Sequence, residues 1–450
     1  MHFSKLLAAI ALLISATTAT AQTDSVFVSG RDTIAYKYTP ATSQTDNKAT
    51  AVAEVQDSDN IKSDSLNSDT PKKKMNFFRR FYRYFAESAT DKTFQKKFDV
   101  TFIGGPSYSE SASLGLGLYA AGLYRIDRSN RKIAPSNVSL YFNITIIGRY
   151  TIGVEGNNIF KDDKQRLTYD IGFRSQPSYF WGLGYQAAMG NRPVEYRCDK
   201  QQIRLTYLYR IFKNAFLGAQ VNFDNLYDAT KWSADSKKYS LENHTLMQGY
   251  LAERQGVGLA RTDYLSTAFT LLLEYDSRDF IPNPSRGLYI SLSETIRPKG
   301  LGNVGCTTWS TKVIVDYYKK LWKGGILALD LYGEFNGNGT PWVFYAKMGG
   351  SSRMRGFYDG RFNDRNMITF QAELRQNIWR RIGATVWGGA GNVFESFDKF
   401  HWGETMPNYG IGLRWEFKKR VNIRIDYGFG MKDYNGRMIH SFMFQINEAF

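Results

Sequence analysis

Between Phe98 and Phe450 the chain consists of short segments in which apolar and polar residues alternate. In VNIRIDYGFG, residues 421–430, apolar or aromatic residues occupy every second position, and asparagine, arginine, aspartate and glycine lie between them. Successive side chains of a β-strand point to opposite faces, so each segment has one apolar and one polar face. This pattern predicts an all-β domain whose strands form a wall between lipid and water.

Sixteen segments are predicted as strands, and an even number is what a single-chain bacterial barrel requires. They are residues 98–105, 113–126, 136–148, 150–160, 165–176, 200–212, 214–226, 265–276, 286–297, 307–320, 325–336, 367–379, 383–394, 407–417, 421–430 and 439–450. After the N-terminal signal no apolar run approaches the ~20 residues of a membrane-spanning helix, so any membrane-spanning part has to be a closed barrel. Connections such as FKN and LWKGG are short, whereas 177–199, 227–264 and 337–366 are long and are expected to face outward.

Three segments precede the predicted barrel of residues 98–450. Residues 1–21 combine Lys5, an apolar run and Ala19-Thr20-Ala21, which is typical of a secretory signal. Residues 22–74 are rich in small and polar residues and are predicted to be a disordered linker. Residues 75–97 predict a short amphipathic helix with aromatic residues on one face and arginines towards the other, suited to a membrane interface, a barrel lumen or one end of the following domain.

The formal net charge of +16 is unevenly distributed. Residues 71–97 contain nine lysines and arginines against Glu87 and Asp91. In an exported chain such a segment favours phosphorylated lipid head groups, including lipopolysaccharide, as partners, and argues against nucleic acid. Cys198 and Cys306 are too few for a disulfide framework, and the sequence leaves open whether they form one bridge.

The segment GGSSRMRGFYDGRFND, residues 349–364, concentrates arginines among glycines and aromatics without a strand or helix period. Its Arg355-Gly356-Phe357 resembles the loop motif of the BamA/TamA superfamily, also called the bacterial surface antigen family. Further matching segments are YDSRDFIPNPSRG at 275–287, with Asp276, Arg278, Asp279, Pro284 and Gly287; AELR at 372–375; and GIGLRWEF to IRIDYG at 410–428. The alternating last strand ending in Phe450 resembles the sorting signal of outer-membrane barrels.

The resemblance implies that this long loop folds back into the barrel and that its arginine reaches acidic residues on the inner wall. An arginine fork can hold a carboxylate by two parallel hydrogen bonds, so the loop would act as a latch. We expect Arg355 to pair with Glu373, with Gly356 allowing close approach of the backbone and Phe357 packing on the wall. The family tends to carry an inward aspartate on the next strand, but this chain has Gly389 there, so Asp426 or Glu416 is expected to supply a second carboxylate.

No Ser/His/Asp set, metal-spaced cluster or phosphate loop stands out, so the sequence predicts neither an enzyme nor a cofactor or metal. The resemblance implies a Gram-negative outer-membrane barrel that inserts or translocates proteins or lipid-linked substrates. The composition of residues 22–97 argues against the periplasmic receiving domains of the family's assembly factors, so partner proteins are expected to supply that module. Two alternatives remain: a gated passive channel, and a structural barrel that anchors an envelope complex.

Overall fold

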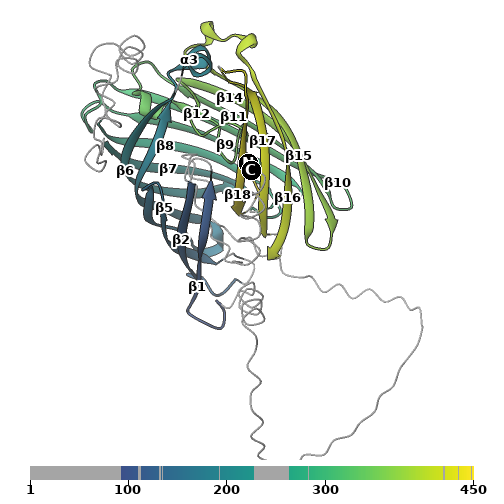
Figure 1. The fold of residues 1–450 in the computed structure, drawn as a ribbon. Coiled ribbons are helices and arrows are strands. Elements are labelled where there is room, and N and C mark those ends of the chain that lie inside the picture. Colours follow the sequence, from purple (N-terminus) through teal and green to yellow (C-terminus); the bar gives the residue numbers. More distant parts are fainter. Residues whose placement is uncertain are drawn as a thin grey trace, which may run out of the picture.

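In a computed structural model, the strands from Phe98 to Ile446 form a β-barrel (Figure 1). The structure describes residues 93–450 except 110–112, 131–132, 134, 192, 228–262, 282, 419–420, 434 and 447. The predicted signal peptide and linker lie outside the described residues, as does the predicted helix up to residue 92. Residues 93–97, its last part, form a turn and not a helix.

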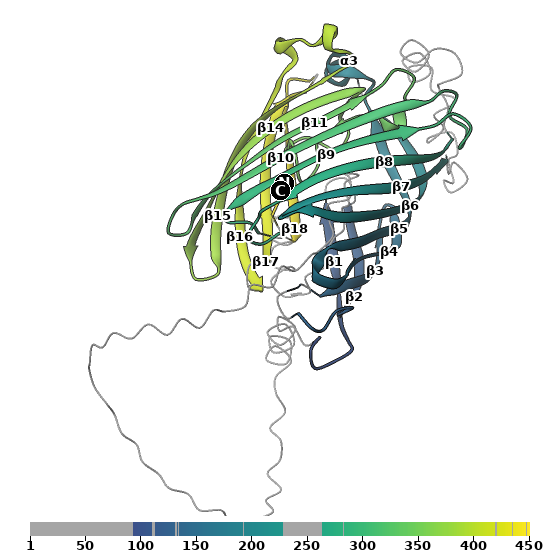
Figure 2. The same ribbon diagram turned by 180° about the vertical axis from the view of Figure 1, so that it is seen from behind.

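Sixteen antiparallel strands make up the barrel, which confirms the predicted fold class. They are β1 (Phe98–Ser109), β2 (Ser113–Tyr124), β3 (Ser136–Thr145), β4 (Tyr150–Ile159), β5 (Gln165–Phe180), β6 (Val194–Phe212), β7 (Ala215–Tyr227), β8 (Tyr264–Asp276), β9 (Gly287–Arg297), β10 (Thr308–Trp322), β11 (Gly325–Asn336), β14 (Asn366–Trp379), β15 (Ile382–Phe394), β16 (Met406–Lys418), β17 (Val421–Lys432) and β18 (Met438–Ile446). Each strand pairs with its neighbours in chain order, and Figure 2 shows β3 to β11 side by side.

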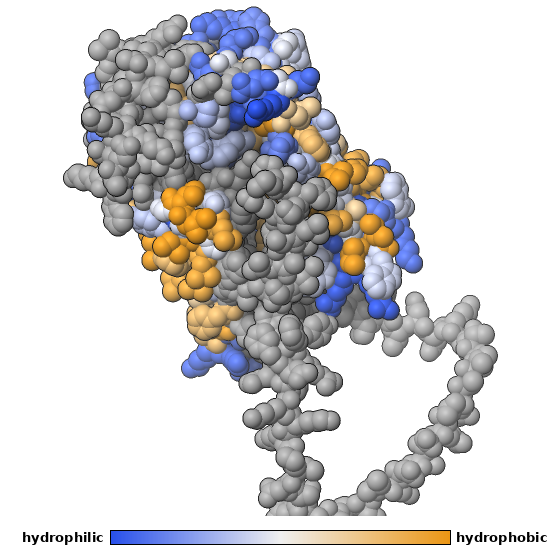
Figure 3. Space-filling model, viewed as in Figure 1, coloured by the Kyte–Doolittle hydropathy of each residue, from blue (hydrophilic) through white to orange (hydrophobic). Residues whose placement is uncertain are grey.

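The alternation of the sequence becomes an outer apolar surface and an inner polar one. Leu114, Leu116 and Leu118 of β2 are each at least half exposed, whereas inward residues such as Thr369 and Gln371 of β14 are fully buried. Figure 3 shows apolar residues gathered along the side of the barrel between hydrophilic ends. Such a surface suits contact with hydrocarbon, because lipid replaces water around the outer side chains.

One pair of neighbouring strands, β1 and β18, is joined by far fewer residue pairs than the others. All the other neighbouring strands of the barrel are joined by at least eight residue pairs in register. Between β1 and β18, among the residues that the structure describes, only Ser109 and Met443 are paired. We call this contact the seam. Along the rest of β1, the only strand partner among the described residues is β2.

The connections between strands depart from the prediction in one respect. The loop expected at 177–199 is shorter, since β5 extends to Phe180, β6 begins at Val194, and the helix α3 (Gly184–Gly190) lies between them. In Figure 1, α3 lies at the end of the barrel opposite the turns that join β14 to β15 and β16 to β17. No helix in the described part of the chain is long and apolar enough to cross a membrane.

Candidate functional site

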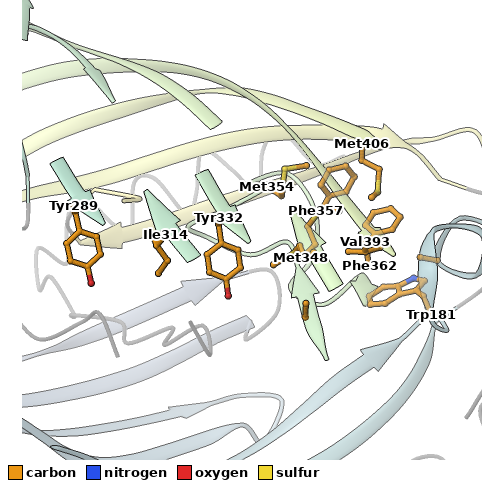
Figure 4. Packing of buried hydrophobic residues seen from close by; sticks show 13 residues of the cluster. Trp181, Tyr289, Ile314, Tyr332, Met348, Met354, Phe357, Phe362, Val393 and Met406 are labelled. Carbon is orange, nitrogen blue, oxygen red and sulfur yellow. The ribbon is translucent and has the colours of Figure 1, made fainter. Parts of the chain in front are cut away.

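The segment between β11 and β14 is an ordered structure that fills part of the barrel. It contains a 3-10 turn (Trp342–Phe344) and two short paired strands, β12 (Ala346–Met348) and β13 (Phe362–Asp364). We call residues 349–361, between these strands, the inserted loop. At its apex Met354, Arg355 and Phe357 are at most 1% exposed. Figure 4 shows Met354 and Phe357 packed close to Met348 and Phe362.

Arg355 lies at the centre of this site and contacts three strands. Its Nη2 donates to Oε2 of Glu373 in β14 at 2.5 Å, and its Nη1 donates to Oδ2 of Asp426 in β17 at 3.0 Å. The guanidinium carbon lies 3.8 Å from the ring centroid of Trp387 in β15. Two charge-assisted hydrogen bonds and a stacked ring fix both the position and the plane of the guanidinium.

Both carboxylates also bind arginines of the barrel wall. Arg375 Nε donates to Glu373 at 2.6 Å, while Arg414 and Arg424 each donate an Nη1 to Asp426, at 2.5 and 3.0 Å. A third carboxylate, Glu448, accepts from Arg414 Nε at 2.8 Å. The cluster therefore joins four arginines to three carboxylates: Arg355, Arg375, Arg414 and Arg424 with Glu373, Asp426 and Glu448. Removing Arg355 would leave equal numbers of wall cations and anions.

The inserted loop is also held by its main chain. Arg424 Nη2 donates to the carbonyl oxygen of Ser351 at 2.8 Å, and Asn408 Nδ2 donates to that of Arg355 at 3.0 Å. The amide of Met354 donates to Oε1 of Gln371 at 3.1 Å. These contacts come from β17, β16 and β14, so the loop is bound to the same part of the wall as its arginine.

Glycines provide the space for this close approach. Gly356 has φ +117°, and a Cβ placed there would lie 2.7 Å from the main chain of Phe429. On the wall, a Cβ at Gly428 would lie 2.7 Å from the carbonyl oxygen of Arg355, and one at Gly430 would lie 2.3 Å from the ring of Phe357. Larger residues at these positions would push the loop away from β17.

Several predicted site residues meet here. Arg355, Glu373 and Asp426 are joined directly, whereas Glu416 is not among the partners of Arg355. At Gly389 a Cβ would lie 2.5 Å from the carbonyl oxygen of Phe370. A carboxylate has no room at that position, which explains why the second carboxylate comes from β17.

Sequence reasoning missed a second loop arginine, Arg353. Its Nε and Nη2 form a fork on Asp330 of β11, with Nη2 to Oδ1 at 2.7 Å, and its guanidinium carbon lies 4.3 Å from the ring centroid of Tyr332. Burial opposes the charged form of Arg353, but the charge and hydrogen bonds of Asp330 raise its pKa above the ordinary value. The sequence held one sign of this contact, because Asp330 lies on the polar face of the segment GILALDLYGEF, residues 325–335.

The motif at 275–287 forms the turn between β8 and β9. Arg278 forms a fork on Asp276, and Asp279 accepts hydrogen bonds from the amide and hydroxyl of Ser285. Pro284 is buried in this turn. Gly287 has φ +120°, and a Cβ there would lie 2.6 Å from Cα of Arg278. These residues shape the turn.

The last strand is predicted to run to Phe450, but β18 ends at Ile446 and residues 448–450 turn towards the charged cluster. Besides its bond to Arg414, Glu448 accepts from Asn422 at 2.7 Å, and the main-chain oxygen of Phe450 accepts from Arg375 Nη2 at 3.0 Å. Cys306 is a free thiol, so the disulfide left open by the sequence is not formed. Among the described residues, no group of three or more His, Cys, Asp or Glu side chains could hold a metal ion.

Comparison with known proteins identifies the family. Residues 141–450 match the Omp85 superfamily domain. The chain belongs to the Omp85 superfamily. This Omp85 protein is therefore a barrel of the Gram-negative outer membrane, in a family of transporters and insertases that are not enzymes. No protein of curated function matches the chain in sequence.

One solved structure shares the architecture. The barrel is similar to BamA from Haemophilus ducreyi lacking POTRA domains 1–3, with a TM-score of 0.52, 12% identity, and coverage of 78% of this chain and 70% of that one. It also matches CdiB from Acinetobacter baumannii, with a TM-score of 0.49, 12% identity, and coverage of 78% of this chain and 60% of that one. At this identity the BamA comparison bears on the fold alone.

Proposed function

We propose that this Omp85 barrel inserts or translocates polypeptide, or lipid-linked substrates, at the outer membrane through its seam. The observation that carries the proposal is the pairing of β1 and β18 at Ser109 and Met443 alone. An unpaired strand edge presents N–H and C=O groups that can add a further strand. A client segment in extended conformation would therefore find a partner at the edge of β1.

The inserted loop acts in this proposal as a latch on one side of the seam. It binds β14 to β17, and β17 is the neighbour of β18. On the other side, the three strands that follow β1, β2 to β4, carry a single charged residue, Glu155, and further charges begin only with β5. We infer that the latch keeps the β14–β17 side rigid while the β1 side is free to move.

The proposal also includes partner proteins. The low aromatic content of residues 22–74 is unsuited to a folded receiving domain, because such a segment buries too little apolar surface. We propose that a separate periplasmic protein delivers the client to the barrel.

A reversible cross-link tests the role of the seam. In a background where Cys198 and Cys306 are replaced by serine, Ser109→Cys with Met443→Cys places a disulfide across β1 and β18. We expect oxidised cells that depend on this protein to lose other outer-membrane barrels or exported clients, and a reductant to restore them.

A matched control places the bond between strands that are already fully paired. Leu116→Cys with Ile144→Cys joins β2 and β3 at an outward-facing registered pair. We expect no change in client levels from this pair. If both disulfides leave client levels unchanged, and Arg355→Ala raises conductance in planar bilayers, a gated channel takes the place of the proposed function.

A further inference from the structure

Cations gather at the short turns of the barrel, at the end opposite α3. The end of β10 carries Lys319 and Lys320, the turn that follows it carries Lys323, and the turn between β14 and β15 carries Arg380 and Arg381. All five are exposed. We call these five residues the cationic rim. Within the described part of the chain, none of the five forms an ion pair with a carboxylate.

The two turns form one surface. The amide of Asn377 donates to the carbonyl oxygen of Gly324 at 2.8 Å, and Trp322 Nε1 donates to Oε1 of Gln376 at 2.7 Å. These bonds join the end of β14 to the turn that follows β10. The two groups of cations therefore lie on one surface, and among the described residues no ion pair with a carboxylate offsets the repulsion between like charges there.

Large apolar side chains lie directly beside the rim. Trp322 is 50% exposed, Trp379 is 60% exposed and Ile378 is 63% exposed. Exposed aromatics at the end of a barrel strand mark the boundary between hydrocarbon and head groups. Lys319 follows the outward-facing Tyr317 on the same face of β10, so its stem lies along the lipid surface and its ammonium group at the boundary.

We propose that the cationic rim binds the head groups of anionic phospholipids in the periplasmic leaflet. Short turns of outer-membrane barrels face the periplasm, so the rim lies at the leaflet made of phospholipids and away from lipopolysaccharide. The phosphate of such a lipid accepts hydrogen bonds from the lysines and arginines of the rim, and the acyl chains of the lipid lie against Trp322 and Trp379. This binding orients the barrel in the membrane, next to the strands that hold the latch, and does not depend on the proposed insertion activity.

Lipid retention by the full-length protein tests the proposal. The protein in mild detergent is titrated with phosphatidylglycerol and, separately, with phosphatidylethanolamine, and bound lipid is counted by native mass spectrometry. We expect the wild-type protein to prefer phosphatidylglycerol and the variant Lys319→Gln, Lys320→Gln, Lys323→Gln and Arg381→Gln to bind it at least tenfold more weakly. Added salt should weaken binding to the wild-type protein, because it screens exposed charges.

A control variant removes the same charge from the opposite end of the barrel. It carries Lys299→Gln, Lys399→Gln, Lys432→Gln and Arg437→Gln, all at exposed positions in or beside the connections β9–β10, β15–β16 and β17–β18. We expect this variant to bind phosphatidylglycerol as the wild type does, and the rim variant to bind lipid A as the wild type does. The proposal fails if the two variants lose phosphatidylglycerol equally. The proposal also fails if the rim variant binds phosphatidylglycerol as tightly as the wild type. A rim variant that keeps this lipid but no longer binds an acidic protein would likewise contradict it.

Discussion

The two sides of the seam present opposite inner surfaces. On one side, β14, β16 and β17 carry buried charged residues, including Glu373, Arg414 and Asp426, and bind the inserted loop. On the other side, the inward residues of β2 to β4 are uncharged except for Glu155, for example Gly117, Ser139 and Asn157. We call these surfaces the charged wall and the neutral wall.

This difference shows why the loop docks on one side. A buried guanidinium needs carboxylates and hydrogen-bond acceptors to offset the loss of water, and only the charged wall supplies several of them together. The inward residues of the neutral wall need fewer hydrogen-bond partners, so its strands are held by their backbone hydrogen bonds and by packing of their outer side chains. If the charged wall carries more of the local stability, substitutions there should cost more free energy of unfolding than substitutions on the neutral wall.

The largest effect is expected from Asp426→Ala. This change leaves three arginines without their shared carboxylate, and removing one partner of a buried ion pair typically costs about 3–5 kcal/mol. The measurement is the free energy of unfolding of the barrel in urea, followed by tryptophan fluorescence. Glu155→Ala on the neutral wall is the control, and equal losses for the two variants would contradict the comparison.

Arg355→Ala is expected to release the inserted loop while the barrel stays folded. It removes two charge-assisted hydrogen bonds, worth about 2–3 kcal/mol of local opening free energy, and leaves three wall arginines facing three carboxylates. Hydrogen exchange of residues 349–361 measures the opening. Arg365→Ala, which removes an ion pair with Glu395, should leave that exchange unchanged. Protection that persists in Arg355→Ala would mean that the main-chain bonds alone hold the loop.

A smaller effect is expected from Gly428→Ala, through shape and not charge. The new methyl group would lie 2.7 Å from the carbonyl oxygen of Arg355, and overpacking of this kind costs about 1–3 kcal/mol. Exchange of the inserted loop should rise, though less than in Arg355→Ala. Gly388→Ala is the control, because its methyl group meets only the carbonyl oxygen of Asn408 at 3.9 Å. If Gly428→Ala and Gly388→Ala raise exchange of the inserted loop equally, steric fit at Gly428 does not hold the loop in place.

The smallest effect is expected on the neutral wall, from Tyr119→Phe. The hydroxyl of Tyr119 donates to Oε1 of Glu155 at 2.8 Å, and because the bond is only partly buried we expect about 1.5 kcal/mol, the low end for a bond to a charged group. Urea unfolding should show a small loss, and exchange of residues 349–361 should not change. A rise in loop exchange would show that the two walls are coupled across the barrel.

Much of the architecture was predictable because a transmembrane strand has to satisfy lipid on one face and water on the other. That requirement makes the period of two visible in segments such as 421–430, and all sixteen predicted segments became barrel strands. The strand ends near 177–199 were less predictable. Beyond the membrane both faces of a strand meet water or protein, so the alternation no longer marks how far β5 and β6 extend.

The sequence by itself determined that this chain forms a barrel, and it pointed to Arg355 and Glu373 as residues to examine. Only the tertiary structure decided that Asp426 and not Glu416 is the second carboxylate, that Arg353 binds Asp330, and that β1 and β18 meet at one pair. The reason is physical. Strand periodicity is a local property of neighbouring residues, whereas these contacts join residues far apart in the chain and depend on how the sheet curves and closes.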